Sequence, residues 1–352
     1  MSLSALTTST TDPTPIFELY RGSYGSELLT AAVAHFHLFD LLATKPMRWD
    51  DLRQAIKLHP RPMNVLITAL RAMGLLTLDS AGFVAPTTLA KHHLSASSPF
   101  DVSGYIGLSA ACAGVHEMIE RLESNRPAGA QEKESGAAFI FRDGIESAME
   151  SEASARHFTL ALSGRAKNVA PVLAQRIDLS SARKVLDIGG GTGIYSIALV
   201  QKNPQLRAIV FDRAEVLKVA AEMVREYGVV DRVELVAGDM FRDPLPADCD
   251  AILLSNILHD WDIPECQTLI ARCAGALSSG GRLLIHDVFL NDPLDGPLPI
   301  ALYSAALYCF TEGRAYSAAE YRSWLSTAGL QPGEVVETLV HCGFLSATKS
   351  AK

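Results

Sequence analysis

The stretch K-V-L-D-I-G-G-G-T-G, residues 184–193, is the feature that most constrains how this chain can fold. Val185 and Leu186 supply the apolar end of a strand, and the run is typical of a strand buried in a parallel sheet. The strand leads directly into glycines, which allow a sharp backbone turn and the close approach of a ligand. Residues 194–201 then have a helical pattern. This order predicts the first strand–turn–helix unit of a doubly wound α/β fold.

The spacing of the glycines indicates which class of ligand such a turn binds. A dinucleotide-binding turn reads G-x-G-x-x-G, whereas Asp187 here precedes Gly189, Gly191 and Gly193 as D-x-G-x-G-x-G, which disfavours a nicotinamide dehydrogenase. The acidic residue disfavours a pyrophosphate and suits a cation. S-adenosylmethionine fits, because it carries an ammonium and a sulfonium and no phosphate. We interpret the stretch as a methyl-donor site; the competing interpretation is an ordinary glycine-rich turn.

Strands and helices alternate after this turn. The predicted second strand, 207–211, ends at Asp212, where a carboxylate can accept hydrogen bonds from both ribose hydroxyls. The third strand, 233–237, leads into Gly-Asp-Met-Phe, in which the aspartate can accept from the adenine amino group while the thioether packs on the ring. We therefore expect a nucleoside site lined by Asp212, Asp239, Met240 and Phe241.

A histidine follows the predicted fourth strand. That strand, 250–254, continues through Ser255 and Asn256 to His259, in the sequence L-H-D-W. The carboxyl ends of parallel strands are where such folds bind ligands, and a neutral imidazole suits proton removal from a phenol near neutral pH. The alternative is a hydrogen-bonded core histidine, and Asp260 is interpreted as a structural group.

The late part of the sheet is predicted to be antiparallel. The fifth strand, 282–287, ends at Asp287, which either orients His259 or caps the strand end. Two further strands, 335–340 and 344–348, are joined by a short turn and form a closing hairpin. We therefore expect an α/β domain over residues 181–352.

Residues 16–100 are predicted to form a winged-helix domain. A helical pattern over 16–43 is followed by helices at 49–56 and 61–75 and by a hairpin with a glycine turn. The first helix is apolar on nearly every face, and too little chain precedes it to cover that surface. We therefore expect a homodimer through residues 16–110.

A winged helix also raises the possibility of DNA binding. The candidate recognition helix offers only Arg61 and Arg71, and residues 1–110 hold eight basic and eight acidic residues within a chain of net charge −8. Because neutralised phosphates supply most of the non-specific affinity for DNA, this composition favours a dimerisation module and no nucleic-acid partner.

Residues 101–180 are predicted to form a helical layer, with helices at 103–123, near 137–150 and at 157–177, that contributes to a substrate pocket. For each candidate lining residue taken singly, a core or surface position is the favoured interpretation over a ligand contact. The candidates are His116, Met118, Phe139, Phe141 and Met149, together with Asn256.

The remaining composition indicates a globular protein. Residues 1–15 are rich in Ser and Thr, lack the basic start and apolar run of a signal peptide, and are expected to be a disordered tail. The six cysteines form no C-x-x-C pair, so we expect buried, reduced thiols in a cytoplasmic protein and no metal site. The sequence contains no run of 18 consecutive apolar residues, so it predicts no membrane-spanning helix.

With these motifs assembled, the chain resembles the metal-independent O-methyltransferases that act on small molecules, such as the caffeate, acetylserotonin and bacterial natural-product enzymes. Four motifs agree in order and spacing: V-L-D-I-G-G-G-T-G, F-D at 211–212, G-D-M-F at 238–241 and L-H-D-W at 258–261. The resemblance covers about residues 16–350. It implies a Rossmann-like class I methyltransferase domain, S-adenosylmethionine as cofactor with S-adenosylhomocysteine as product, and a small aromatic hydroxyl compound as substrate.

The resemblance also implies roles by position. His259 matches the catalytic base and Asp287 a carboxylate that flanks it, while Phe158 matches a donor-side F-x-x-x-M turn in which Leu162 replaces the methionine. The residues implied to contact the donor are Asp187, Gly189, Gly191, Asp212, Asp239, Met240, Phe241, Ser255 and Phe158. Two positions depart from the family pattern. Ala315 stands where plant enzymes have a second glutamate beside the histidine, so that support is either missing or comes from Glu312, and Ser255 stands where they have a lysine.

Two other classes of function compete with this interpretation. The same fold can carry N- or C-methylation or a reaction that transfers no methyl group, and His259 favours a hydroxyl acceptor without excluding these. A winged-helix regulator that senses S-adenosylmethionine is the second, and the neutral candidate recognition helix disfavours it.

Overall fold

The computed structural model describes residues 3–126 and 152–351, and the chain divides into two compact units. The α/β unit comprises Met1–Phe17, Phe139–Phe289 and Tyr316–Lys352, and the helical unit comprises Glu18–Ala138 and Leu290–Ala315. The predicted sequential blocks differ from this division, because helix α13 (Leu298–Phe310) belongs to the helical unit. It buries Ala305, Tyr308 and Cys309 in that unit's apolar core.

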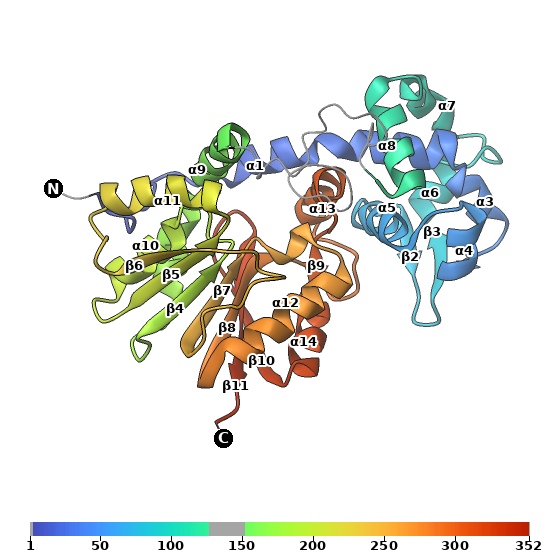
Figure 1. Cartoon of the computed structure of the whole chain (residues 1–352). Coiled ribbons are helices and arrows are strands. Elements are labelled where there is room, and N and C mark those ends of the chain that lie inside the picture. The colour runs from blue at the N-terminus through green and yellow to red at the C-terminus, as the bar shows by residue number, and fades with distance from the viewer. Residues whose placement is uncertain (1–2, 127–151, 352) are drawn as a thin grey trace. The chain divides into compact units, whose positions relative to one another are not determined.

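An eight-stranded mixed sheet organises the α/β unit (Figure 1). Its order is β10-β11-β8-β7-β4-β5-β6, with β9 paired to β8. Strands β6, β5, β4, β7 and β8 are parallel, whereas β11 is antiparallel to both β8 and β10. The bounds are β4 (Lys184–Ile188), β5 (Arg207–Asp212), β6 (Val233–Ala237), β7 (Cys249–Ser255), β8 (Leu277–Leu290), β9 (Tyr316–Ser317), β10 (Leu330–Glu337) and β11 (Cys342–Lys349).

These strands confirm the predicted α/β class and the closing antiparallel hairpin. Several boundaries differ: β8 begins at Leu277 and not at residue 282, and β10 spans Leu330–Glu337 where the sequence predicts residues 335–340. The strand order reverses at β4, which has β5 on one side and β7 on the other. A ligand crevice is expected at the carboxyl end of a strand in this position.

Helices cover both faces of this sheet. Helices α9 (Glu152–Arg176), α10 (Ile194–Lys202) and α11 (Ala214–Glu226) pack on one face, and α12 (Ile263–Ala276) and α14 (Ala318–Thr327) pack on the other (Figure 1). Successive residues of β4 alternate between the two cores, since Val185 belongs to the first and Leu186 to the second. Burial on both faces explains the nearly continuous apolar run in this strand.

The helical unit confirms the predicted order of helix, helix and hairpin. Helices α4 (Trp49–Ala55) and α5 (Pro60–Ala72) precede the hairpin of β2 (Leu76–Leu78) and β3 (Phe83–Pro86), to which β1 (Met47–Arg48) adds a third strand. The unit's other helices are α2 (Gly25–Thr30), α3 (Leu38–Thr44), α6 (Thr88–His93), α7 (Ser103–Ile106) and α8 (Ala113–Ser124), and α1 (Thr14–Arg21) contains the boundary between the units.

The single helix predicted over 16–43 is wrong. After α1 the chain passes through a 3₁₀ turn, α2 and a π-helical turn (Ala31–His35) before α3 begins. His37 has a left-handed φ of 47°, which breaks the helical repeat. The break re-aims the chain so that Leu38, Phe39 and Leu42 enter the same core as Leu28.

This burial removes the argument by which the sequence predicted a dimer. Leu28, Leu38, Phe39 and Leu42 are at most 2% exposed within one chain, so no second subunit is needed to cover them. Large apolar side chains are exposed elsewhere among the described residues of the helical unit. They are Leu19, Tyr20, Leu89, Phe100, Val102, Tyr105, Leu108 and Leu298.

Three smaller expectations also need correction. The helix predicted over 103–123 is interrupted between α7 and α8, and the helix expected near 137–150 lies outside the described residues. The expected disordered tail is wrong at Ala5, which is buried in the α/β core and whose N–H donates to Gln201 Oε1 over 2.8 Å. Five cysteines are buried as expected, but Cys112 is exposed.

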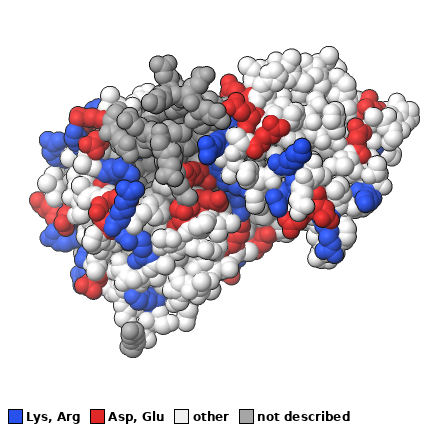
Figure 2. Space-filling model, turned by 45° about the vertical axis from the view of Figure 1, so that its right-hand side comes forward, with Lys and Arg blue, Asp and Glu red and all other residues white. Residues whose placement is uncertain are grey.

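The surface carries charges of both signs. On the face that Figure 2 shows, Lys and Arg side chains are interspersed with Asp and Glu side chains. Among the described residues, no helix combines the length and the apolar character needed to cross a membrane.

Candidate active site

The glycine turn after β4 forms an open cradle. Gly189 and Gly191 have φ values of 66° and 57°, in the left-handed region that favours glycine. A Cβ on Gly189 would lie 2.4 Å from Ile257 Cδ1, whereas a Cβ on Gly191 would meet no atom of residues 3–126 and 152–351 within 4 Å. The turn is therefore packed on its inner side and leaves space for a ligand at Gly191.

Asp187 lies beneath this turn as a fully buried carboxylate. Its Oδ2 accepts a hydrogen bond from Ser196 Oγ over 2.8 Å, and its Oδ1 has no hydrogen-bond partner among the described residues. Burial raises the pKa of Asp187 to about 7, although the Ser196 hydrogen bond acts in the opposite direction. A buried carboxylate with an unpaired oxygen is costly in a folded protein, and a cationic ligand at the turn would lower that cost.

Asp212 ends β5 next to the cradle. Its Oδ2 accepts from the Gly191 N–H over 2.9 Å, and its Oδ1 accepts from the Arg213 N–H over 2.7 Å. Burial raises the pKa of Asp212, and these two hydrogen bonds oppose the rise. The carboxylate is thus fixed by backbone groups at the position predicted for ribose recognition.

The segment after β6 supplies the residues predicted for the adenine side. Asp239 Oδ1 accepts from the Phe241 N–H over 2.8 Å, and Asp239 Oδ2 lies 3.5 Å from Arg213 Nη2. Met240 is partly buried, and the Phe241 ring packs edge-on against Trp261 with centroids 4.6 Å apart. Asp239 therefore also stabilises the turn that presents this segment.

His259 lies in a short 3₁₀ turn (Leu258–Asp260) that follows β7. Its Nδ1 is 2.5 Å from Asp287 Oδ1, at the carboxyl end of the neighbouring strand β8, and its Nε2 is 3.6 Å from Asp260 Oδ1. The Tyr321 hydroxyl donates to the other Asp287 oxygen over 3.4 Å. Asp287 therefore contacts His259 directly, so the predicted pair is brought together.

The electrostatics of His259 are set by opposing effects. Burial lowers its pKa, but the charges of Asp287 and Asp260 and the hydrogen bond to Asp287 outweigh burial and raise the pKa above 6.5. Burial raises the pKa of Asp260 to about 6. When Nδ1–H donates to Asp287, neutral His259 is in the tautomer whose Nε2 carries no proton.

A polar network that the sequence did not predict adjoins this histidine. Ser255 Oγ lies 2.8 Å from His286 Nδ1 and accepts from Asn256 Nδ2 over 3.0 Å. Arg165 Nη2, from α9, donates to Asn256 Oδ1 over 2.6 Å and to Cys342 Sγ over 2.7 Å. Arg165 and His286 belong to none of the sequence motifs, and only the fold brings them to the strand ends.

The remaining predicted residues have different surroundings. Phe158 is partly buried on α9, in edge contact with His157. His116 is exposed on α8 of the helical unit, and Met118 is fully buried in that unit's core, so it is not a pocket residue. Phe139, Phe141 and Met149 lie outside the described residues.

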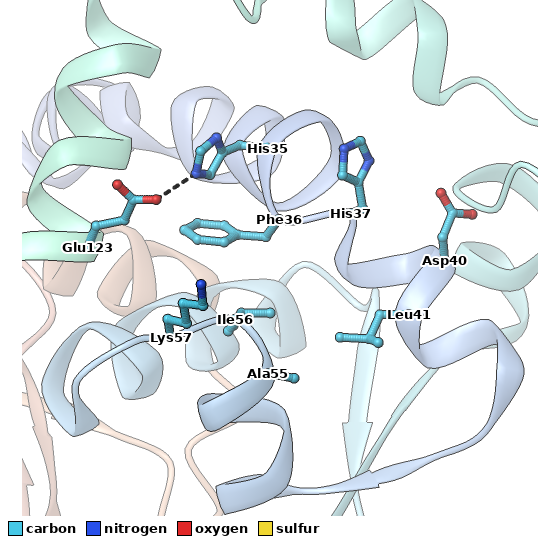
Figure 3. Close-up of a pocket in the computed structure, with 9 residues that line it drawn as sticks. All are labelled: His35, Phe36, His37, Asp40, Leu41, Ala55, Ile56, Lys57 and Glu123. Carbon is cyan, nitrogen blue, oxygen red and sulfur yellow. Dashed lines mark hydrogen bonds and ion pairs between the residues drawn. The ribbon is translucent and has the colours of Figure 1, made fainter.

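No group of three or more His, Cys, Asp or Glu side chains in residues 3–126 and 152–351 is arranged to hold a metal ion. A shallow cavity of about 410 Å³ lies in the helical unit, where the His35–Glu123 pair lies beside Phe36, and Leu41 lies near Asp40 (Figure 3). Its mixed charges indicate no particular ligand.

Comparison with known proteins places this geometry in a family. A family model described as an O-methyltransferase domain matches residues 128–331, more than half of the chain. The chain is 33% identical to a 3-hydroxy-5-methyl-1-naphthoate 3-O-methyltransferase of Streptomyces sahachiroi, over 90% of this chain and 89% of that protein. It is 28% identical to an L-tyrosine C(3)-methyltransferase of Streptomyces lavendulae, over 88% and 85% of the two chains.

A solved structure gives a stronger match. An O-methyltransferase family 2 protein from Planctomyces limnophilus, crystallised in complex with apigenin, is 47% identical over 99% of both chains, with a TM-score of 0.89. The buried His259–Asp287 pair and the glycine cradle therefore occur in a chain that belongs to the O-methyltransferase family.

Proposed function

We propose that this chain transfers a methyl group from S-adenosylmethionine to a hydroxyl of a small aromatic molecule, with His259 as general base and without a metal ion. The observation that carries the proposal is the 2.5 Å contact between His259 Nδ1 and Asp287 Oδ1, at the carboxyl ends of β7 and β8. This contact fixes the imidazole where doubly wound folds bind their ligands.

The glycine cradle fits a cationic donor. Among the described residues, none would contact a Cβ at Gly191, and none bonds to Oδ1 of the buried Asp187 beneath it. Asp212 would hold the ribose, and Asp239 and Met240 the adenine. The sulfonium supplies the driving force for methyl transfer when the donor is bound, so the protein has to position the two reactants and remove one proton.

His259 would remove that proton. Asp287 holds the imidazole in the tautomer whose Nε2 is unprotonated, and this nitrogen can accept the hydroxyl proton as the oxygen attacks the methyl carbon. The imidazolium that forms is flanked by Asp287 and Asp260, whose charges stabilise it. The nearby Asp260 supplies a second carboxylate at the histidine, where Ala315 replaces the glutamate of plant enzymes.

The relatives support an aromatic hydroxyl compound as acceptor. One relative acts on a hydroxynaphthoate, and the 47% identical protein was crystallised with apigenin, a polyphenol. The similarity to an L-tyrosine C(3)-methyltransferase supports C-methylation of a phenol as the second candidate. In that reaction a base would also serve, because ionising the phenol activates the ring carbon next to it.

The test is a panel of hydroxylated aromatics incubated with donor labelled in the methyl group. The panel includes apigenin, hydroxynaphthoates, hydroxyindoles and hydroxyquinolines, and the linkage of each product is read by mass spectrometry and NMR. An O-methyl ether is expected; a C- or N-methyl product would replace the proposal with the second candidate or a related one. No transfer to any acceptor, with donor bound, would contradict methyl transfer to this substrate class.

Donor binding is measured separately by titration calorimetry. Asp212→Ala should weaken S-adenosylmethionine binding by about 1–3 kcal/mol, because it leaves the partners of a charged hydrogen bond unpaired. An unchanged dissociation constant would show that Asp212 does not hold the donor.

A further inference from the structure

Arg165 is a cation among the buried acids of the active site, and nothing in the sequence motifs explains it. It is partly buried on α9, and its Nη2 donates to Asn256 Oδ1 over 2.6 Å and to Cys342 Sγ over 2.7 Å. These contacts fix the guanidinium between the end of β7 and the start of β11.

Asn256 links this cation to the turn that carries His259. Its φ of 57° is left-handed, which is uncommon for a residue other than glycine. Three contacts hold it there: its N–H donates to the His286 carbonyl over 2.8 Å, its Nδ2 donates to Ser255 Oγ, and its Oδ1 accepts from Arg165. His259 follows only three residues later, so the Arg165 contact fixes the start of its turn.

The acidic groups around His259 also favour a cation close to them. In the part of the chain that the structure describes, the groups that face His259 or its partner Asp287 include Asp260 on the same turn, Asp287 and His286 on β8, Tyr321 on α14, Cys266 on α12 and Arg165 on α9. Burial lowers the pKa of His286 to about 3, so His286 is neutral. With His259 neutral, two ionised aspartates would leave two negative charges, which are costly away from water.

We propose that Arg165 is a positioning residue for the methyl-transfer reaction: through Asn256 it fixes the turn that carries His259, and its charge offsets one of the two aspartates. The cluster then carries one negative charge while His259 is neutral and becomes neutral when His259 accepts the proton. This inference rests on the proposed role of His259 as the base.

The sign of the expected pH effect follows from this charge. The positive charge of Arg165 disfavours protonation of His259 and lowers its pKa, in opposition to Asp287 and Asp260. Removing the charge raises the pKa of His259, so the base stays protonated to a higher pH.

The test compares Arg165→Gln, which removes the charge, with Arg165→Lys, which keeps it and loses the planar fork. Arg156→Gln is the matched control, because Arg156 lies on the same helix in an exposed pair with Glu222. The pKa of His259 is measured by NMR on protein with labelled histidine, with its signal assigned through His259→Ala, and the pH–rate profile is measured with the acceptor found above.

We expect Arg165→Gln to raise the pKa of His259 by about one unit and to move the rising limb of the rate profile equally. Arg165→Lys should keep the pKa of His259 near the wild-type value but turn over more slowly at saturating acceptor, and Arg156→Gln should match wild type. An unshifted His259 signal in a folded Arg165→Gln protein would overturn the proposal. So would a loss confined to donor affinity, since Arg165 would then be a donor ligand.

The NMR titration requires no turnover. If the wild-type protein methylates no acceptor, the proposed function fails while the effect of Arg165 on His259 can still be measured.

Discussion

At the scale of single residues, the site is built from acids whose burial is unfavourable without a partner. Asp287 has His259, and Asp212 has two backbone N–H donors, but Asp187 Oδ1 has no partner among the described residues. Groups held in an unfavourable state are concentrated at functional sites. We therefore expect that Asp187 lowers the stability of the free protein and strengthens donor binding.

Replacing Asp187 by Asn tests the expected effect on stability. The folded-state pKa of about 7 lies above the value near 3.9 of an unfolded chain, so the contribution of Asp187 to stability is present at low pH and is lost as the pH rises towards 7. The Asp187→Asn variant lacks this pH-dependent loss of stability. Relative to wild type, its free energy of unfolding should therefore increase by about 1–2 kcal/mol between pH 5 and pH 7. Urea unfolding at both pH values measures it.

The same variant should bind S-adenosylmethionine more weakly. Equal stability differences at pH 5 and pH 7 would contradict the raised pKa, and unchanged donor affinity would remove Asp187 from the binding site.

At the scale of elements, the helix starts and strand ends fix the catalytic groups. Helix α14 begins with a capping box, in which Ser317 Oγ accepts from the Glu320 N–H and the Glu320 carboxylate accepts from the Ser317 N–H. The next residue, Tyr321, donates to Asp287. The cap thus stabilises the helix that supports the His259–Asp287 pair from the second face of the sheet.

Ser317→Ala should lower the free energy of unfolding by about 1 kcal/mol, the usual effect of losing an N-cap. Thermal unfolding is the measurement, and Ser323→Ala, an exposed position on the same helix, is the control. If both variants unfold at the wild-type temperature, the capping box does not stabilise α14.

At the scale of the whole molecule, the features that could be predicted from the sequence are those that depend on local sequence patterns. The strands of the α/β unit, the glycine turn and the positions of Asp212 and His259 follow from apolar runs that end in polar residues. The break at His37 was missed, because it depends on how Leu38 and Phe39 reach a core formed by distant residues. Arg165 was missed because it lies 91 residues before Asn256, and only the fold joins them.

Whether two copies of the chain form a dimer is also a property of the whole molecule. We propose a homodimer, now through the exposed apolar side chains of the helical unit, such as Tyr105 and Leu108, which are 80% and 77% exposed. Light scattering should give twice the mass of one chain, and the double variant Tyr105→Ser, Leu108→Ser should shift the equilibrium towards monomer. Val230→Ser, which removes an exposed apolar side chain from the α/β unit, is the control. A monomeric wild-type protein at micromolar concentration would contradict the proposal.

His259 is proposed to remove the acceptor proton, and the His259→Ala variant lacks the group that would do so. The variant and wild type are compared for labelled methyl transfer at saturating donor and acceptor, with donor affinity measured in parallel by calorimetry. We predict that turnover falls about 10²–10⁴-fold, the usual contribution of a positioned general base, while the donor dissociation constant stays within about twofold, since the account gives His259 no contact with the donor's nucleoside. Wild-type turnover in a folded His259→Ala protein would contradict the account.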